Sequence, residues 1–253
     1  LKEFNRERNL DPKLVESLAK AKSKGYESWQ EAKKKSDFKV FLPFFEELVK
    51  LRIEEAKQIS DQYSPWETLA QPFEPELTLK WLNKMFQPLK DTLPDLIRGI
   101  NNSKKYHWDL SPESQHNLCS KLLDEFGRDK DLVVVGKSPH PFSITLGPND
   151  YRITTRIVEG EPLSSFLATA HEWGHSIYEQ GLPSQSHQWF AWPLGQATSM
   201  GIHESQSLFW ENRIVKSKSF SKRFFKKFVS AGCTLNNYHE LWKSINHLEA
   251  GLN

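Results

Sequence analysis

The sequence has little cysteine, no excess of charge of one sign and no long apolar run. Its 2 cysteines, Cys119 and Cys233, are too few for the disulfide framework of a small secreted protein, which favours a reducing compartment. The 34 Lys and Arg nearly balance the 32 Asp and Glu, so the one-sign field that nucleic-acid or polybasic membrane binding requires is missing. No stretch approaches the ~18 apolar residues of a membrane span. We therefore expect neither a nucleic-acid partner nor a membrane anchor.

The composition, 38% hydrophobic and 26% charged over 253 residues, is that of an ordinary globular protein. A chain of this length buries about 70% of its unfolded surface, so it can form a core without metals or disulfides as staples. Any metal that it holds is therefore expected to serve chemistry. The chain begins without Met and ends just after a helical pattern, and we expect both ends to be cut from a longer protein.

Apolar residues at helical spacing predict helices through most of residues 1–130. Pro88 and Pro94 interrupt one apolar stripe and predict a break or kink there. Ser111-Pro112-Glu113 is typical of a helix start, and Gly127 predicts the end of this helix. The first part of the chain is therefore expected to be helical.

The sequence pattern changes from helical spacing to strand-like alternation between residues 131 and 160. Alternating residues over 142–146 and the turn sequence Gly147-Pro148-Asn149-Asp150 predict a β-hairpin. Helices are expected again from 162 to 180, from 198 to 216 and in two later segments, within residues 161–253. We predict one mainly α domain over 1–253, with a small β-hairpin or sheet between two helical parts, and itself part of a larger domain.

His171-Glu172-Trp173-Gly174-His175 matches His-Glu-x-x-His within an expected helix. At about 100° and 1.5 Å per residue, the two imidazoles lie on one helix face about 6 Å apart and can converge on one ion, with Glu172 beside them. A chain of this composition contains about 0.02 such motifs by chance. Two histidines without a metal are the alternative; we interpret the motif as a zinc-type hydrolytic site.

A catalytic zinc needs a third protein ligand and an open position. The extended pattern with a third histidine is excluded, because it requires Gly at position 178 and His at position 181. This chain has Tyr178 and Gly181 there. The next helix carries Glu204 and Glu211, and Gly201 would let it approach the first helix closely. Glu204 follows the motif after a distance that fits one loop, although a surface carboxylate remains an alternative. His203 points about 100° away from Glu204, so we interpret it as a group behind the ligands or facing substrate.

Four motifs occur together in order: His140-Pro141-Phe142, Asp150-Tyr151-Arg152-Ile153-Thr154, the His-Glu-x-x-His motif, and His203-Glu204-Ser205-Gln206. In this order and spacing the chain resembles the carboxypeptidase Taq family of metallocarboxypeptidases. The resemblance implies that His171, His175 and Glu204 hold one divalent metal ion, most simply zinc with cobalt or manganese as alternatives, and that Glu172 is the general base. Asp150, Arg152 and Thr154 match a motif beside the site, and we assign Asp150, Arg152 and His203 to substrate binding.

The resemblance further implies a cytoplasmic, mostly helical and commonly dimeric enzyme with a deep groove, acting on peptides with a free C-terminus. Members are about twice as long. Two further family motifs, Ile-Arg-x-x-Ala-Asp and Gly-x-x-Gln-Asp-x-His-Trp, are absent from this chain, and the first contains the Arg expected to bind the substrate carboxylate. We therefore expect an internal fragment of such an enzyme, whose activity alone is uncertain.

The expected reaction uses the ion to polarise the scissile carbonyl, with Glu172 moving a proton from water to the leaving nitrogen. Arg152 and Arg156 would share a strand face if the strand runs unbroken between them, and one could meet the peptide, or both could be ordinary surface charges. Trp189, Phe190 and Trp192 could line the groove or simply pack. An endopeptidase or aminopeptidase with the same metal triad, and an inactive helical interaction module, are the alternative functions.

Overall fold

The computed structural model describes residues 4, 6, 8–99, 108–183 and 186–247. Its contacts divide the chain into two compact units, Leu1–Asp91 and Thr92–Asn253. The sequence pattern instead changes near residue 130, where helical spacing gives way to strand-like alternation. That the whole chain forms one domain stays a prediction, and residues 249–253, at the expected cut end, lie outside the described residues. In the described part no helix is both long and apolar enough to cross a membrane.

The first unit is made of helices. They are α2 (Pro12–Lys35), α3 (Leu42–Ile59), α4 (Pro65–Ala70) and most of α5 (Leu79–Gly99), with a short 3-10 turn at Phe38–Val40. Asp11 caps the start of α2 by accepting a hydrogen bond from the backbone N–H of Lys13. The helices α2 and α3 pack together, and Leu14, Leu18 and Ala56 are buried. The helical prediction for this part is confirmed.

The helix α5 runs unbroken through both of its internal prolines. Of the break or kink predicted at Pro88 and Pro94, the break is wrong, since both prolines lie inside Leu79–Gly99, and the kink stays a prediction. Each proline removes its own N–H bond and its ring crowds the carbonyl group four residues earlier, but its fixed φ is compatible with a helix, so the flanking turns can continue. No described residue of α5 is buried.

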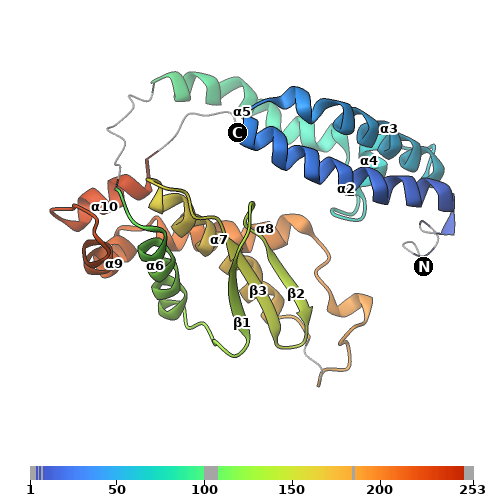
Figure 1. The fold of residues 1–253 in the computed structure, drawn as a ribbon. Helices are drawn as coiled ribbons and strands as arrows, with labels where there is room; N and C mark the ends of the chain where they lie inside the picture. The colour runs from blue at the N-terminus through green and yellow to red at the C-terminus, as the bar shows by residue number, and fades with distance from the viewer. Residues whose placement is uncertain (1–3, 5, 7, 100–107, 184–185, 248–253) are drawn as a thin grey trace. The chain divides into compact units, whose positions relative to one another are not determined.

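The second unit contains three strands and the remaining helices (Figure 1). They are α6 (Pro112–Glu125), β1 (Val133–Lys137), β2 (Ser143–Gly147), β3 (Asp150–Thr155), α7 (Pro162–Gln180), α8 (Met200–Leu208), α9 (Lys218–Ala231) and α10 (Tyr238–Ile245), with a 3-10 turn at Pro193–Gly195 and a π-helical segment at Phe209–Val215. Ser111 caps α6 by accepting from the backbone N–H of Ser114. The mainly α fold class with a small sheet is confirmed.

The sheet has the strand order β1-β3-β2. The predicted hairpin is present: β2 and β3 are antiparallel, and Asn149 in the turn between them has a φ of 62°. The strand β1 adds a parallel partner on the other edge of β3, with Val133 opposite Tyr151. The sheet packs against α7, which contacts both β2 and β3.

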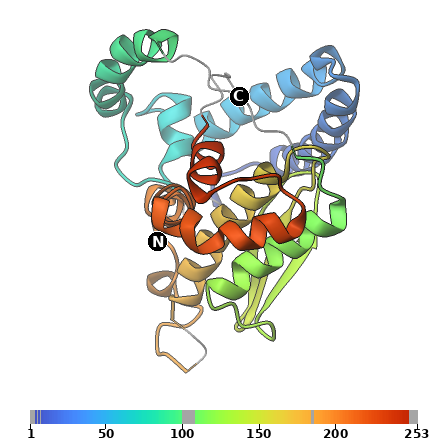
Figure 2. The same ribbon diagram turned by 90° about the vertical axis from the view of Figure 1, so that its left-hand side faces the viewer.

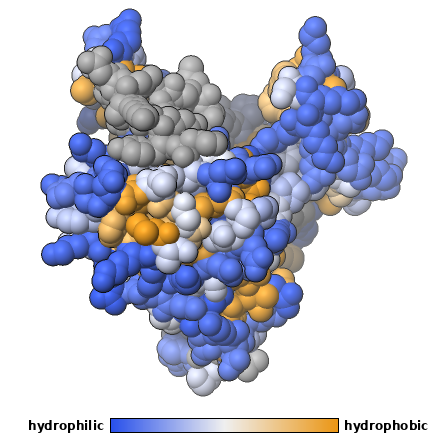
Figure 3. Space-filling model, turned by 60° about the vertical axis from the view of Figure 1, so that its left-hand side comes forward, coloured by the Kyte–Doolittle hydropathy of each residue, from blue (hydrophilic) through white to orange (hydrophobic). Residues whose placement is uncertain are grey.

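Two apolar clusters hold α7 in place. One joins α6, α7, α9 and α10 through side chains such as Leu122, Phe166, Phe224 and Phe228, and Figure 2 shows α9 and α10 side by side at this end of the unit. The other joins α6, the sheet and α7 through Leu123, Val133, Ile153 and Trp173. Hydrophobic patches also remain on the surface among hydrophilic side chains (Figure 3).

The helix expected over 198–216 is present in two parts. A regular helix, Met200–Leu208, continues into the π-helical segment Phe209–Val215. In this segment Trp210 contacts Phe126 and Trp173, while its neighbour Glu211 contacts His171. Wide π turns of this kind occur often at functional sites.

Candidate metal centre

The helix α7 presents His171 and His175 on one face. Its start carries Pro162, and Phe166, Ala170 and Trp173 are buried on its other sides. The two imidazole rings lie one turn apart, with centroids 5.0 Å from each other. Packing of α7 on all but this face therefore fixes the direction in which both histidines point.

The helix α8 reaches this face because Gly174 has no side chain. A Cβ atom at Gly174 would lie 2.4 Å from the Cα of Ser207 and 2.5 Å from the carbonyl oxygen of Gln206. The close approach expected at Gly201 is instead made by Gly174, and Gly201 itself is exposed. Contact at Ser207 brings Glu204, one turn earlier, to the level of the histidines.

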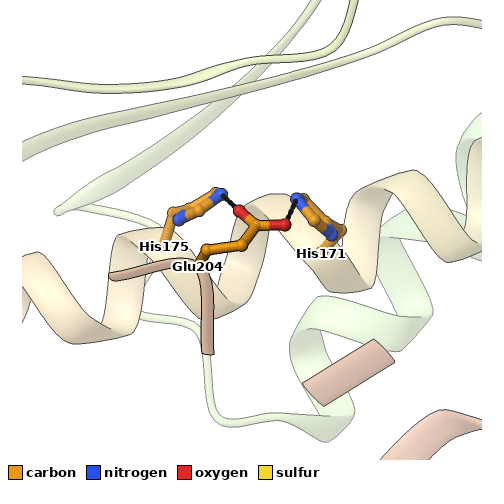
Figure 4. A group of neighbouring side chains, drawn as sticks. All are labelled: His171, His175 and Glu204. Atoms are coloured by element: carbon orange, nitrogen blue, oxygen red, sulfur yellow. Dashed lines mark ion pairs between the residues drawn. The ribbon is translucent and has the colours of Figure 1, made fainter. Parts of the chain in front are cut away.

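Three donor atoms converge between the two helices. The carboxylate of Glu204 lies 3.7 Å from Nε2 of His171 and 3.3 Å from Nε2 of His175, and Figure 4 shows the two rings facing its two oxygens. All three donor atoms lie within 4.8 Å of one another. Atoms that each lie about 2.1 Å from one zinc ion are at most about 4.2 Å apart. The two carboxylate to imidazole separations, each to a different oxygen of Glu204, meet this limit. The full set of donors, within 4.8 Å, therefore fits a metal ion after a small inward movement of the side chains.

Glu172 lies beside this cluster in an almost dry position. Only 7% of its surface is exposed, and burial raises the pKa of its carboxyl to about 7. A carboxyl with a pKa near neutrality can both accept and return a proton. A bound cation would add the opposite influence and favour the carboxylate form.

The second ring nitrogen of His171 contacts Glu211. Nδ1 of His171 lies 3.0 Å from Oε2 of Glu211, and this hydrogen bond raises the pKa of His171 above its ordinary value. Burial by itself would raise the pKa of Glu211, but the hydrogen bond to His171 and the ammonium group of Lys216 lower it. The pair directs Nε2 of His171 toward Glu204.

The second ring nitrogen of His175 contacts another histidine. Nδ1 of His175 lies 2.6 Å from Nδ1 of His203, whose Nε2 lies 2.8 Å from Oε1 of Glu179. Burial is the largest cause that lowers the pKa of His175 to about 4. His175 is therefore neutral at pH 7 and can offer a lone pair. Both ring nitrogens of His203 are engaged within the chain.

The hairpin residues of the candidate site contact one another. Arg152 donates two hydrogen bonds to Asp150, of 2.9 and 3.1 Å, and lowers the pKa of that carboxyl. The hydroxyl group of Thr154 accepts from the backbone N–H of Phe142. The strand β3 ends at Thr155, so Arg156 lies beyond it and the shared strand face does not form. A role of Asp150 and Arg152 toward substrate stays a prediction.

The loop between α7 and α8 carries the three expected aromatic residues. Trp189 and Trp192 are exposed and contact each other edge to face. Phe190 lines a pocket of about 430 Å³ together with Tyr151 and Glu179. The pocket therefore lies next to the hydrogen-bonded pair formed by Glu179 and His203.

Two carboxylates that the structure brings to the cluster had received no role from the sequence. Glu179 stands four residues after His175, and Glu211 stands seven after Glu204. Both spacings return to the same helix face, so they were a usable signal. Neither spacing shows which atom the carboxylate meets.

A sheet-backed helix with two histidines four residues apart, a facing glutamate and a buried glutamate next to the first histidine is typical of metallopeptidases. The chain belongs to the carboxypeptidase Taq (M32) metallopeptidase family, whose model matches residues 1–253. The resemblance expected from the four motifs is confirmed.

Relatives agree over most of the chain. Thermostable carboxypeptidase 1 of Thermus thermophilus is 33% identical over 256 residues, which cover 93% of this chain and 50% of that protein. Carboxypeptidase 1 of Bacillus subtilis is 36% identical over 215 residues, or 83% of this chain and 42% of that protein. The structure of Trypanosoma cruzi metallocarboxypeptidase 1 matches with a TM-score of 0.79 at 28% identity, over 96% of this chain and 50% of that one. The chain spans about half the length of these relatives.

Proposed function

We propose that this chain carries the metal-binding part of a metallocarboxypeptidase that removes residues from the C-terminus of peptides. His171, His175 and Glu204 hold one divalent ion, and zinc is the proposed natural ion because the donors are two imidazoles and one carboxylate. The observation that supports this is the convergence of the three donors beside the buried Glu172. The names of the relatives support the exopeptidase class.

Each residue of the cluster has a part in the proposed reaction. A bound divalent ion supplies a Lewis acid that polarises the scissile carbonyl and acidifies water. Glu172 takes the proton from the attacking water and delivers it to the leaving nitrogen, for which a pKa near 7 is suited. Glu211 and His203 hold the two imidazoles in their orientation.

The other properties implied by the family resemblance are proposed with the function. They are a peptide substrate with a free C-terminus, a homodimer, a cytoplasmic location, and contacts from Asp150 and Arg152 to substrate. The substrate contact expected of His203 is not proposed, because both of its ring nitrogens already have partners within the chain. Arg152 already holds Asp150, so as a carboxylate anchor it would have to exchange partners.

The test measures metal content and peptide cleavage on the same samples. His171→Ala and His175→Ala should each lose the ion together with activity, and full occupancy in both would contradict the site. Glu172→Gln should keep the ion while turnover falls by a factor on the order of 10²–10⁴. Loss of the ion in Glu172→Gln would instead make Glu172 a ligand.

The substrate class is tested with an N-blocked dipeptide and its C-terminal amide. A carboxypeptidase releases the last residue only from the free acid. Cleavage of the amide at a similar rate would indicate an endopeptidase, and a requirement for a free N-terminus would indicate an aminopeptidase. Protein that binds no metal under any condition would support the alternative of a helical interaction module.

A further inference from the structure

Behind His175 lies a row of two hydrogen bonds that leads away from the candidate metal centre. It runs from Nδ1 of His175 to Nδ1 of His203, at 2.6 Å, and from Nε2 of His203 to Oε1 of Glu179, at 2.8 Å. His203 and Glu179 are largely shielded from water, with 23% and 24% of their side chains exposed. Hydrogen bonds in such surroundings are stronger than in bulk water.

The donors and acceptors of this row leave one arrangement of protons that suits metal binding. An ionised carboxylate only accepts, so the proton between Glu179 and His203 sits on Nε2 of His203. A neutral His203 then has an unprotonated Nδ1, which accepts from Nδ1–H of His175. A neutral His175 with its proton on Nδ1 has a free lone pair on Nε2, the nitrogen that lies 3.3 Å from Glu204.

Helix geometry explains why these residues meet. Glu179 follows His175 by four residues on α7, so it lies one turn further along the same face. His203 precedes Glu204 on α8, and the close crossing at Gly174 and Ser207 brings α8 against α7. The two helices thus supply the three donors and the row behind them together.

We propose that Glu179 and His203 are positioning residues that hold His175 in the tautomer with its proton on Nδ1 and with Nε2 open to a divalent ion. The inference rests on the proposed function. His171 obtains the same orientation from a single carboxylate, Glu211, whereas His175 obtains it through an intervening histidine. Partners of this kind usually contribute 10–100-fold to metal affinity.

Two pairs of variants separate the hydrogen bonds from the space that the side chains fill. His203→Asn keeps an acceptor oxygen at the place of Nδ1, while His203→Phe removes it. Glu179→Gln keeps an acceptor for His203, while Glu179→Leu removes it and releases His203 to present an N–H to His175. Gln180→Leu, a similar loss of a polar side chain on α7, is the matched control, because the side chain of Gln180 donates to the hydroxyl group of Ser176 and not to the row.

The measured quantity is the Zn²⁺ dissociation constant, obtained by competition with a chromophoric chelator. We expect His203→Phe and Glu179→Leu to raise it by about 10–100-fold, and His203→Asn, Glu179→Gln and Gln180→Leu to leave it within about threefold of the parent protein. Nitrogen NMR of the metal-free protein should show an unprotonated Nε2 on His175 in the parent and a protonated one in Glu179→Leu. Thermal unfolding identifies any variant that has lost its fold. For the variants that remain folded, the tautomer of His175 seen by NMR decides whether the hydrogen bonds of the row set it.

Parent-like affinity in both His203→Phe and Glu179→Leu would overturn the proposal, as would an equal loss in His203→Asn and His203→Phe at equal thermal stability. A protonated Nε2 on His175 in the parent protein would overturn it too. These outcomes leave the proposed function intact as long as His171→Ala abolishes zinc binding. If His171→Ala binds zinc like the parent, the proposed metal site itself fails.

Discussion

At the scale of single residues, Glu172 is a carboxylic acid whose charge is costly where it lies. Burial raises its pKa to about 7 from an ordinary value of 4.5, which corresponds to about 3 kcal/mol of cost for the ionised form. The packing of α7 between the sheet and the other helices offsets this cost. A pKa near neutral pH suits the proton transfer that we propose for this carboxyl.

This cost predicts a pH-dependent difference in stability between two metal-free proteins, the parent and Glu172→Gln. The folded parent binds the Glu172 proton more tightly than the unfolded chain does. The loss of stability caused by ionising Glu172 is therefore absent below pH 4.5 and complete above pH 7. Gln cannot ionise. The free energy of unfolding of Glu172→Gln relative to the parent should therefore rise by about 3 kcal/mol between those limits.

Urea unfolding at a series of pH values checks this, with Glu159→Gln as the control because Glu159 is exposed in the same unit. The lowered pKa of His175 acts in the opposite direction, but it acts in parent and variant alike and cancels in the difference. A pH-independent difference would show that Glu172 titrates like an exposed carboxyl.

At the scale of elements, the site depends on how closely α7 and α8 approach. Gly174→Ala would place a Cβ atom 2.4 Å from the backbone of Ser207, and backbone on both sides leaves no flexible side chain to move aside. The helices must separate, which carries Glu204 away from both histidines. We expect a destabilisation of about 1–3 kcal/mol together with weaker metal binding.

Gly25→Ala provides the matched control for Gly174→Ala. Gly25 also lies inside a helix, but its nearest neighbour to a new Cβ is a ring atom of Phe41 at 4.0 Å, an ordinary contact. There the better helix propensity of Ala should stabilise the protein by up to about 1 kcal/mol. The two changes should thus differ in sign, measured by urea unfolding; equal effects would mean that the crossing at Gly174 is not tight.

The helix α8 and the π-helical segment that follows it supply two carboxylates to His171. Glu204 and Glu211 are two turns apart and meet opposite nitrogens of His171. The backbone carbonyl of Lys216, at the end of the π-helical segment, accepts hydrogen bonds from Trp242 and Asn246. The last helix therefore holds the end of the segment that carries Glu211.

At the scale of the whole molecule, two helices carry apolar stripes that the described chain leaves exposed. On α3 the stripe is formed by Phe45, Val49 and Ile53, and on α5 by Trp81, Met85, Leu89, Leu93 and Ile97. Spacings of four residues place each set on one helix face. Exposed patches of this kind promote association.

We therefore predict that this 253-residue chain, produced alone, self-associates with rising concentration and binds a hydrophobic dye. The double change Met85→Glu with Leu89→Glu should reduce both effects, because it places charge in the stripe. Lys84→Glu with Lys90→Glu, a charge change on exposed polar positions of the same helix, is the control. Light scattering that shows a monomer in the parent chain, or equal effects of the two double changes, would contradict the prediction.

Much of the fold and part of the site follow from the sequence alone. Helical periodicity predicts α7 and the shared face of His171 and His175, because the hydrogen bonds of a helix join residues four apart and repeat the same geometry everywhere. The turn residues around Asn149 predict the hairpin for the same local reason. The unbroken α5 shows the limit of such rules, because two prolines weaken a helix without always ending it.

What only the tertiary structure decides is which of the equivalent side chains meet. Glu204 and Glu211 lie on one helix face by their spacing, and nothing local distinguishes them. The crossing of α7 and α8 at Gly174 and Ser207 brings Glu204 to the Nε2 atoms and Glu211 to Nδ1 of His171. The same crossing brings His203 between His175 and Glu179, and the parallel pairing of β1 with β3 joins segments separated along the chain. These contacts join residues far apart in sequence, and their geometry depends on how whole helices and strands pack, which no local spacing contains.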